Sequence, residues 1–240
     1  MMLQTPVHEI EIIIVLLYVL VGLFFNASFS ASSKPFSRLL GKFPNERADR
    51  LRVYLQRITG MFFFGFVPVI LILTLLPSTF RDYGTSLTEP TEILSWGLLF
   101  ALLIIPLILF RGKSASNLAA YPQIRSKKWN LNIVVLSALT WIGYLLCYEF
   151  LFRGFLLFAC QRAFGIIPAI VINVLIYAIA HIPKGKFETI GAIPLGLVLC
   201  VLTIKTGSIW FAFLAHVIMA LANEWVALYH NKNIELEMKF

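Results

Sequence analysis

The chain has 240 residues, of which 59% are hydrophobic and only 13% are charged, and its mean hydropathy is +0.84. Because a soluble chain carries roughly 25% charged residues, this composition excludes an ordinary soluble domain. The formal charge of +8 does not indicate a nucleic-acid binder, since the basic residues lie between apolar runs and not on one solvated face. We therefore expect a lipid bilayer, and no nucleic acid, around this protein.

Seven apolar stretches follow one another along the chain. A helix needs about 20 mostly apolar residues to cross the hydrocarbon core of a bilayer. The stretches that meet or approach this length are residues 9–29, 58–79, 93–111, 131–164, 167–182, 188–204 and 208–229. The predicted fold class is an all-α, polytopic transmembrane helix bundle of about seven (seven to eight) transmembrane helices. Residues 31–57 are predicted to be a long basic loop.

The number of crossings depends on residues 131–164, which could form one tilted helix or two. Cytoplasmic loops collect Lys and Arg. One crossing places 16 of the 20 basic residues on one side and 3 on the other, with Arg153 inside the bundle, whereas two crossings give 14 and 5. The segment around Tyr148 has no Gly, Pro or Asn to make a turn. We therefore expect one crossing, with the N-terminus outside and the C-terminus in the cytoplasm.

Ionisable residues inside these apolar stretches are the strongest functional signal. Each costs about 2.5–3.5 kcal/mol at the centre of a membrane helix, so each needs a partner or a purpose. Glu149 and Arg153 are spaced i, i+4 and can pair directly. Asn173, Tyr177 and His181 follow at the same spacing and form one polar stripe on the next helix.

Further polar residues lie on the last two stretches. His216 and Asn223 share one helix face, Glu188 begins the sixth stretch, and Glu224 is expected to reach the cytoplasmic interface. A carboxylate and a histidine can remove a proton from water for amide hydrolysis, while a second histidine and an amide stabilise the oxyanion. Two histidines and one glutamate could instead bind a catalytic zinc ion. A third reading is a buried ion pair with two histidines that only fix how the helices pack.

Three sequence blocks resemble a known family. The segments YEFLFRGFL, YAIAHIPKGKFETIGAIPLGLVL and TGSIWFAFLAHVIMALAN, within residues 131–229, resemble the signature blocks of the CPBP family. These are the CAAX-protease and bacteriocin-processing membrane proteins, also called Abi, and they are related to the Ras-converting prenyl-protein endopeptidases. The resemblance implies a glutamate-type intramembrane peptidase that needs no metal or other cofactor. Residues 131–229 would then be the catalytic core, residues 1–130 the N-terminal helices with basic loops, and residues 230–240 a short tail.

The first two motifs of that family fall on the fourth and fifth stretches. In the Glu-Glu-x-x-x-Arg motif, Tyr148 stands where the family has its leading glutamate, which is usually assigned as the water-activating base. Glu149 and Arg153 match the other two positions. The aromatic-x-x-x-His motif is matched by Tyr177 and His181. The resemblance therefore implies that His181 activates water, with Glu149 as its carboxylate and Arg153 orienting Glu149.

The third motif, His-x-x-x-Asn or Asp, is only half matched. His216 is present, but Ala220 stands where the second residue should be, and Asn223 follows about one turn later on the same face. We expect His216 and Asn223 to stabilise the oxyanion, and Glu188 to be an alternative carboxylate. The residues expected to bind the substrate are Tyr148, Tyr177 and Asn173.

The substrate implied is a hydrophobic or membrane-anchored peptide, and the expected location is a bacterial inner (plasma) membrane. Because Tyr148 and Ala220 both depart from the family at catalytic positions, a second hypothesis stays open. It is a catalytically inactive membrane protein of the same scaffold that acts in bacteriocin self-immunity or in partner binding.

Overall fold

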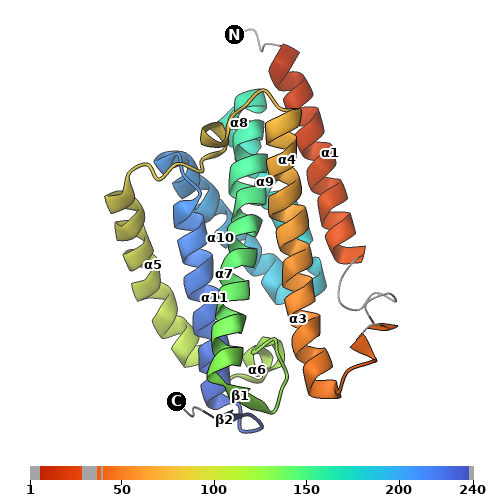
Figure 1. The fold of residues 1–240 in the computed structure, drawn as a ribbon. Coiled ribbons are helices and arrows are strands. Elements are labelled where there is room, and N and C mark those ends of the chain that lie inside the picture. The colour runs from red at the N-terminus through yellow and green to blue at the C-terminus, as the bar shows by residue number, and fades with distance from the viewer. Residues whose placement is uncertain (1–5, 29–36, 39, 238–240) are drawn as a thin grey trace.

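The structure is a computed structural model that describes residues 6–28, 37–38 and 40–237. It is a bundle of long helices that run roughly side by side (Figure 1). Its long helices and helical segments are α1 (Pro6–Ser28), α3 (Asn45–Met61), α4 (Val67–Thr74), α5 (Pro90–Arg111), α7 (Leu131–Glu149), α8 (Leu157–Phe164), α9 (Ile166–His181), α10 (Lys186–Thr206) and α11 (Trp210–His230). The shorter elements are η1 (Phe62–Phe66), η2 (Phe80–Tyr83), α6 (Ala115–Ala120), β1 (Lys128–Asn130), η3 (Phe150–Leu156), η4 (Ile182–Lys184) and β2 (Glu235–Glu237).

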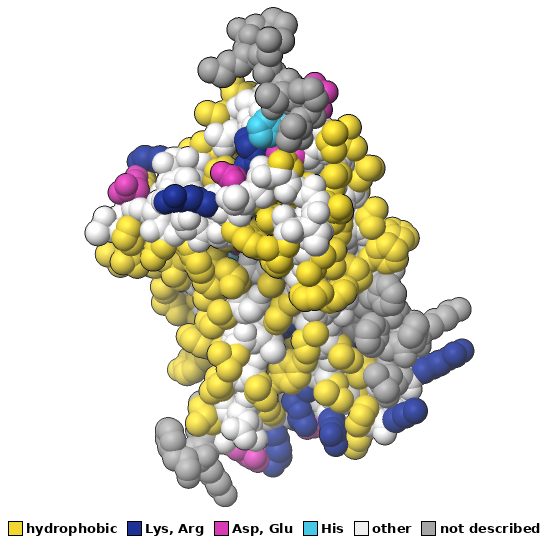
Figure 2. All heavy atoms as spheres, turned by 45° about the horizontal axis from the view of Figure 1, so that its top comes forward, with side chains coloured by type: hydrophobic (Ala, Val, Ile, Leu, Met, Phe, Trp, Pro, Cys, Tyr) yellow, Lys and Arg dark blue, Asp and Glu magenta, His cyan; other side chains and the backbone are white. Residues whose placement is uncertain are grey.

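The predicted fold class is confirmed. Within the described residues, six helices are long and apolar enough to cross a membrane, and each coincides with a predicted stretch. The remaining stretch, residues 167–182, forms α9, which has 16 residues and therefore spans only about 24 Å. On the face seen in Figure 2, hydrophobic side chains cover the middle of the molecule and charged side chains gather toward its two ends. The chain is a multi-pass membrane protein.

The beginning of the second crossing differs from the prediction. Residues 31–57 were expected to be a loop, but α3 begins at Asn45 and continues through η1 and α4 as one helix to Thr74. Residues 31–36 and 39 of the predicted loop lie outside the described residues. The early start has a local reason, because the sequence after Pro44 is rich in Glu, Ala, Arg and Leu, which favour helix. Arg57 is consequently buried in the bundle and is not part of a solvated loop.

Residues 131–164 form a single helix, as predicted. The side chain of Asn130 caps its N-terminus by accepting a hydrogen bond from the backbone N–H of Ile133 at 3.0 Å. The 34 residues of α7, η3 and α8 extend over about 51 Å, well beyond the hydrocarbon core of about 30 Å. The helix ends where Gly165 adopts φ 84°, a conformation that favours glycine.

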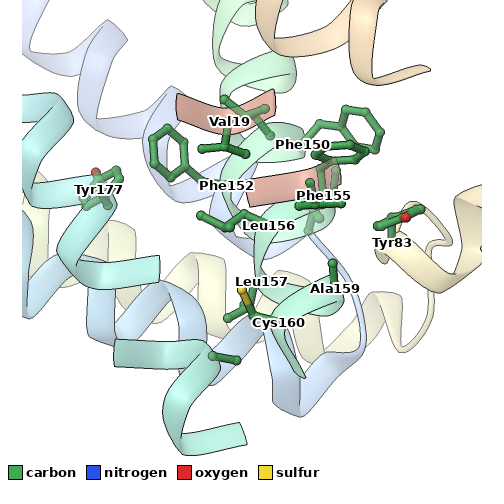
Figure 3. Close-up of a cluster of buried hydrophobic side chains, with 14 of the residues drawn as sticks. Val19, Tyr83, Phe150, Phe152, Phe155, Leu156, Leu157, Ala159, Cys160 and Tyr177 are labelled. Carbon is green, nitrogen blue, oxygen red and sulfur yellow. The ribbon is translucent and has the colours of Figure 1, made fainter. Parts of the chain in front are cut away.

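The middle of this long helix is the centre of the hydrophobic core. The segment η3 is a π-helix in which all seven side chains are buried. Phe150, Phe152 and Phe155 project from it in different directions, toward residues such as Val19 of α1 and Tyr83 of η2 (Figure 3). A Cβ atom at Gly154 would lie 2.8 Å from the backbone oxygen of Tyr83. The close approach of η2 therefore requires glycine at that position.

The C-terminal tail is attached to the bundle through a two-stranded parallel sheet. The strand β2 pairs with β1, with Lys128 opposite Glu235. Lys128 also forms an ion pair with Glu237 at 2.5 Å, and this contact raises the pKa of the Lys128 ammonium group. The two strands are the described exception to the all-α prediction, and they hold the tail against the segment that leads into α7.

Candidate active site

Glu149 and Arg153 form a buried ion pair at the junction of α7 and η3. The Nε atom of Arg153 lies 3.5 Å from Oε2 of Glu149, and neither side chain is exposed. The direct pairing predicted from their i, i+4 spacing is confirmed. The guanidinium also lies over the ring of Tyr177, 4.3 Å from its centroid. Because its nitrogens make no hydrogen bond to the described residues, Arg153 is held by the carboxylate charge and by this aromatic ring.

His216 of α11 connects this buried carboxylate to Tyr177. Its Nδ1 donates a hydrogen bond to Oε1 of Glu149. In a neutral imidazole Nε2 is then the accepting nitrogen. The hydroxyl of Tyr177 lies 3.2 Å from Nε2 and donates to it. The three residues therefore form a hydrogen-bonded chain from Tyr177 through His216 to Glu149.

His181 lies one helical turn after Tyr177. Its Nδ1 is 2.9 Å from the backbone carbonyl oxygen of Tyr177. Because a carbonyl only accepts hydrogen bonds, Nδ1 carries the proton, and Nε2 is the nitrogen able to accept one. The ring centroid of Tyr148 lies 6.4 Å from that of His181 and 5.9 Å from that of His216. The bundle thus brings both histidines together around two tyrosines.

A cavity of about 650 Å³ opens beside this cluster. Six of the sequence-predicted site residues line it: Tyr148, Tyr177, His181, Glu188, His216 and Asn223. Its remaining walls come from α3, α5, α7, α10, α11 and the segment between α5 and β1. The three other predicted residues do not line the cavity and are fully buried: Glu149, Arg153 and Asn173. Tyr177 is also 0% exposed, although it borders the cavity. The structure therefore separates the polar residues of the cavity wall from a second set behind it.

Asn173 belongs to the second set. Its side-chain amide donates a hydrogen bond to the carbonyl oxygen of Phe152 at 2.5 Å, and its oxygen accepts one from the thiol of Cys200 at 3.2 Å. The carbonyl of Phe152 lies in the π-helical segment, where backbone hydrogen bonding is irregular. Asn173 is thus placed to hold η3, and with it Arg153, at a fixed position against α9.

Tyr148 and Asn223 face the cavity with donor groups. The hydroxyl of Tyr148 makes no hydrogen bond to any described residue. Asn223 donates one amide hydrogen to the carbonyl oxygen of Met219 at 2.8 Å, one turn back on its own helix. The second amide hydrogen of Asn223 is available to a ligand. Ala220, by contrast, packs in a small apolar cluster with Trp141 and carries no polar group.

A second buried ion pair lies beside the same cavity, with its arginine in the cavity wall, and the sequence analysis missed it. Glu224 was expected to reach the interface, but it is buried and accepts hydrogen bonds from Trp141, at 2.7 Å, and from Ser137. Its ion partner is Arg57 at 3.5 Å. The expectation was wrong because residues 45–57, predicted as part of a loop, form the start of a helix that places Arg57 next to Glu224. The i, i+4 spacing of Ser137 and Trp141 on α7 was the available sign of a polar partner.

Comparison with known proteins agrees with this constellation. Residues 128–222 match the family described as type II CAAX prenyl endopeptidase, Rce1-like. This part of the chain is similar to that family. The match includes Glu149, Arg153, His181 and His216 and ends just before Asn223. No curated protein and no solved structure matches the chain. The resemblance inferred from the three sequence blocks is confirmed, and the matched residues extend from β1 into α11.

The donor set of this region was also tested for a metal site. Among the residues described, no group of three or more His, Cys, Asp and Glu side chains is placed to hold a metal ion. Glu149 already pairs with His216, whose Nε2 accepts from Tyr177. The zinc reading of the two histidines and a glutamate would require these contacts to break.

Proposed function

We propose that the protein is an intramembrane endopeptidase that hydrolyses a peptide bond in a hydrophobic or membrane-anchored peptide by means of a histidine- and glutamate-activated water. The observation that carries this proposal is the cavity, because it joins His181, His216 and Glu188 in one wall within the bundle. The similarity of residues 128–222 to a CAAX endopeptidase family supports the same reaction class.

We assign His181 as the base. Its Nδ1–H donates to the Tyr177 carbonyl, so Nε2 is the proton-accepting nitrogen, and the ring lines the cavity. Nε2 would remove a proton from the attacking water and later deliver it to the leaving nitrogen. A neutral imidazole fixed in one tautomer by a backbone carbonyl suits both transfers.

The carboxylate contribution is divided between Glu188 and Glu149. Glu188 is exposed to the cavity at the first turn of α10, so it can hold the water or balance the charge of protonated His181. Glu149 is buried behind His216 and cannot touch the water without a rearrangement of α7. We therefore assign Glu149 a positioning role through His216, with Arg153 orienting its carboxylate.

We assign stabilisation of the oxyanion to Asn223 and Tyr148. Both line the cavity, and both have a donor hydrogen that can point into it. His216 is less suited to this task than the sequence suggested, because its neutral form has no hydrogen on Nε2. Tyr148 thus contributes as a donor at the position where the family has a glutamate, since an ordinary tyrosine, with a pKa near 10, is a poor base.

The proposed orientation places the basic end of the bundle in the cytoplasm. The elements α6 and β1, which follow α5, lie at the same end of the bundle as β2 (Figure 1). Arg111 and Gln123 also line the cavity. The N-terminus would then be outside, the C-terminus inside, and the cavity accessible from the cytoplasmic side of a plasma membrane, which we take to be bacterial.

A second candidate is a non-catalytic binding protein, in self-immunity or partner sequestration. One observation favours it: Tyr148 occupies the position where the family has its leading glutamate, and Glu149 is buried and does not line the cavity. This candidate expects Ala220→Leu, which fills the cavity, to abolish function in the host and His181→Ala to preserve it.

The test compares membrane and secreted peptides of cells that express either the wild-type protein or His181→Ala at equal levels. Precursor peptides that accumulate only with His181→Ala would support the peptidase and identify its cleavage site. Identical peptide profiles, with His181→Ala still functional in the host, would overturn the peptidase in favour of the binding protein.

A further inference from the structure

In the assignments above, the hydrogen-bonded chain from Tyr177 through His216 to Glu149 has only a positioning role, and Tyr177 takes no part in the chemistry. We propose that Tyr177 is an additional catalytic residue: its hydroxyl is the entrance of a proton relay that transfers the second proton of the attacking water to His216, with the Glu149 carboxylate balancing the charge. This inference rests on the proposed peptidase function. It gives a chemical reason for a charged pair that is fully buried in a membrane helix.

Peptide hydrolysis requires two proton removals from the water. The first proton leaves when the water oxygen attacks the scissile carbonyl, and His181 takes it. The second leaves when the tetrahedral adduct collapses, because its hydroxyl becomes part of a carboxylate. At that moment His181 is delivering its proton to the leaving nitrogen, so a different acceptor is needed beside it. The ring centroids of Tyr177 and His181 are 4.4 Å apart, which places a second acceptor next to the first.

Tyr177 can pass that proton on and remain a neutral phenol, because it gains one proton from the adduct as it gives another to His216. As the carbon–nitrogen bond breaks and the second carbon–oxygen bond forms, the adduct hydroxyl gives its proton to the Tyr177 oxygen. The original Tyr177 proton moves along its existing hydrogen bond, 3.2 Å between oxygen and Nε2, to His216. The resulting imidazolium keeps its Nδ1–H on the Glu149 carboxylate. The reverse path later releases the proton to water that enters the cavity.

The charges around the relay favour this direction. The groups that face it are Glu149 behind His216, Arg153 over the ring of Tyr177, and the ring of Tyr148. Glu149 balances the positive charge that appears on His216. Arg153, 4.3 Å from the centroid of the Tyr177 ring, balances the negative charge that develops on the Tyr177 oxygen during transfer. The arrangement resembles the serine–histidine–aspartate relay, with a phenol in place of the serine hydroxyl.

The test is Tyr177→Phe, which removes one oxygen and keeps the ring over which Arg153 lies. Tyr54→Phe is the matched control, because Tyr54 lies outside this cavity and its buried hydroxyl makes no hydrogen bond to the described residues. The probe is an internally quenched peptide with an S-farnesyl cysteine, assayed with purified protein in detergent. We expect Tyr177→Phe to lower kcat by about 100-fold, the usual contribution of acid–base catalysis, with KM nearly unchanged.

Two further readouts separate a relay from a structural role. The first readout is the rate of hydrolysis plotted against the fraction of D₂O in the solvent. For the wild type this plot should be curved, because several protons move in the transition state. For Tyr177→Phe it should be a straight line, because one proton moves. In ¹⁵N-histidine NMR spectra, Tyr177→Phe should shift Nε2 of His216 and leave its Nδ1–H resonance in place. Equal kcat and equal isotope dependence in wild type and Tyr177→Phe would overturn the relay.

The same experiments distinguish failure of the relay from failure of the peptidase. If wild type and His181→Ala both leave the peptide probe and all cellular precursors intact, the peptidase is wrong, and the relay's catalytic role falls with it. If wild type hydrolyses the probe and His181→Ala does not, the peptidase stands, and Tyr177→Phe alone decides on the relay.

Discussion

Two glutamates near the same histidines have very different surroundings. Glu149 is fully buried, with Arg153 on one oxygen and His216 on the other, whereas Glu188 faces the cavity. A buried carboxylate that neutralises an arginine contributes to stability, and its removal leaves an uncompensated charge. A carboxylate on a cavity wall contributes little to stability but can act on a bound ligand. The two residues should therefore be separable by experiment.

Glu149→Gln should destabilise the protein by about 3–5 kcal/mol, because Arg153 loses the only charge that offsets its burial. Glu188→Gln should leave the melting temperature in detergent unchanged and lower kcat. Thermal unfolding and probe hydrolysis measure the two effects. Glu9→Gln, at an exposed position of α1, is the control that should change neither. Equal melting temperatures for Glu149→Gln and the control would show that the buried ion pair is not needed for the fold.

Hydrolysis should be insensitive to metal chelators. The imidazole nitrogens of His181 and His216 are oriented by a backbone carbonyl and by Glu149, which leaves Glu149 and the two histidines without a shared open position. The measurement is the rate of probe cleavage before and after dialysis against EDTA. Loss of activity on dialysis with recovery on adding zinc would instead support the reading of two histidines and a glutamate as metal ligands.

At the scale of the elements, the π-helical segment η3 determines where the site residues lie. It follows Glu149 directly and contains Arg153, and it packs with all its side chains buried. A π-helical turn exposes backbone carbonyls to partners other than the usual N–H four residues later. The amide of Asn173 takes up one of them, at Phe152. This contact links η3 to α9, the helix that carries Tyr177 and His181.

Asn173→Ala should therefore loosen the site without altering any residue of the cavity wall. The Phe152 carbonyl and the Cys200 thiol would each lose a partner, at a cost of about 1–3 kcal/mol for each buried group left unsatisfied. We expect a lower melting temperature and a lower kcat together. Asn223→Ala is the contrasting variant, because its amide bonds only to its own helix. That variant should lower kcat and leave the melting temperature unchanged.

The elements and the site were predictable from the sequence to different degrees. Apolar runs and charge distribution predicted the crossings and the single helix of residues 131–164, since both depend only on local composition. The i, i+4 pairing of Glu149 and Arg153 followed in the same way. The contact of His216 with Glu149 did not, because it joins residues 67 positions apart. The helical start of α3 was missed because its charged first turns read as a solvated loop.

At the scale of the molecule, helices outside the matched family region complete the site. Residues 128–222 are similar to the endopeptidase family, yet α3 and α5, which lie outside this match, also line the cavity, through residues such as Gln56, Arg57 and Ile104. In the described structure α5 packs mainly on α11, and α3 packs mainly on α7. The helices α3 and α5 thus form one wall of the cavity, and the matched region by itself would leave that side open.

The ion pair of Arg57 and Glu224 is the polar link between that wall and α11. Arg57 of α3 also donates hydrogen bonds to the Ser137 carbonyl at 2.7 Å and to Thr140 at 2.7 Å on α7. Removing one member of a buried pair costs about 3–5 kcal/mol, whereas replacing both by apolar residues is often neutral or stabilising. Arg57→Met should therefore lower the melting temperature strongly, and Arg57→Met combined with Glu224→Met should recover most of the loss.

The same double-mutant comparison shows whether the link serves only stability. If it does, the double variant should hydrolyse the probe with wild-type kcat and KM once it is folded, because His181, Tyr177 and Glu188 are unchanged. We expect instead that kcat is retained and KM rises, because Arg57 lies in the cavity wall and holds the side-chain oxygen of Gln123 at 3.1 Å. Because the side-chain oxygen of Gln123 accepts this hydrogen bond, the amide hydrogens of Gln123 can be donated to a ligand. Without Arg57 the amide is no longer held in that orientation. An unchanged KM in the folded double variant would restrict the pair to a structural role.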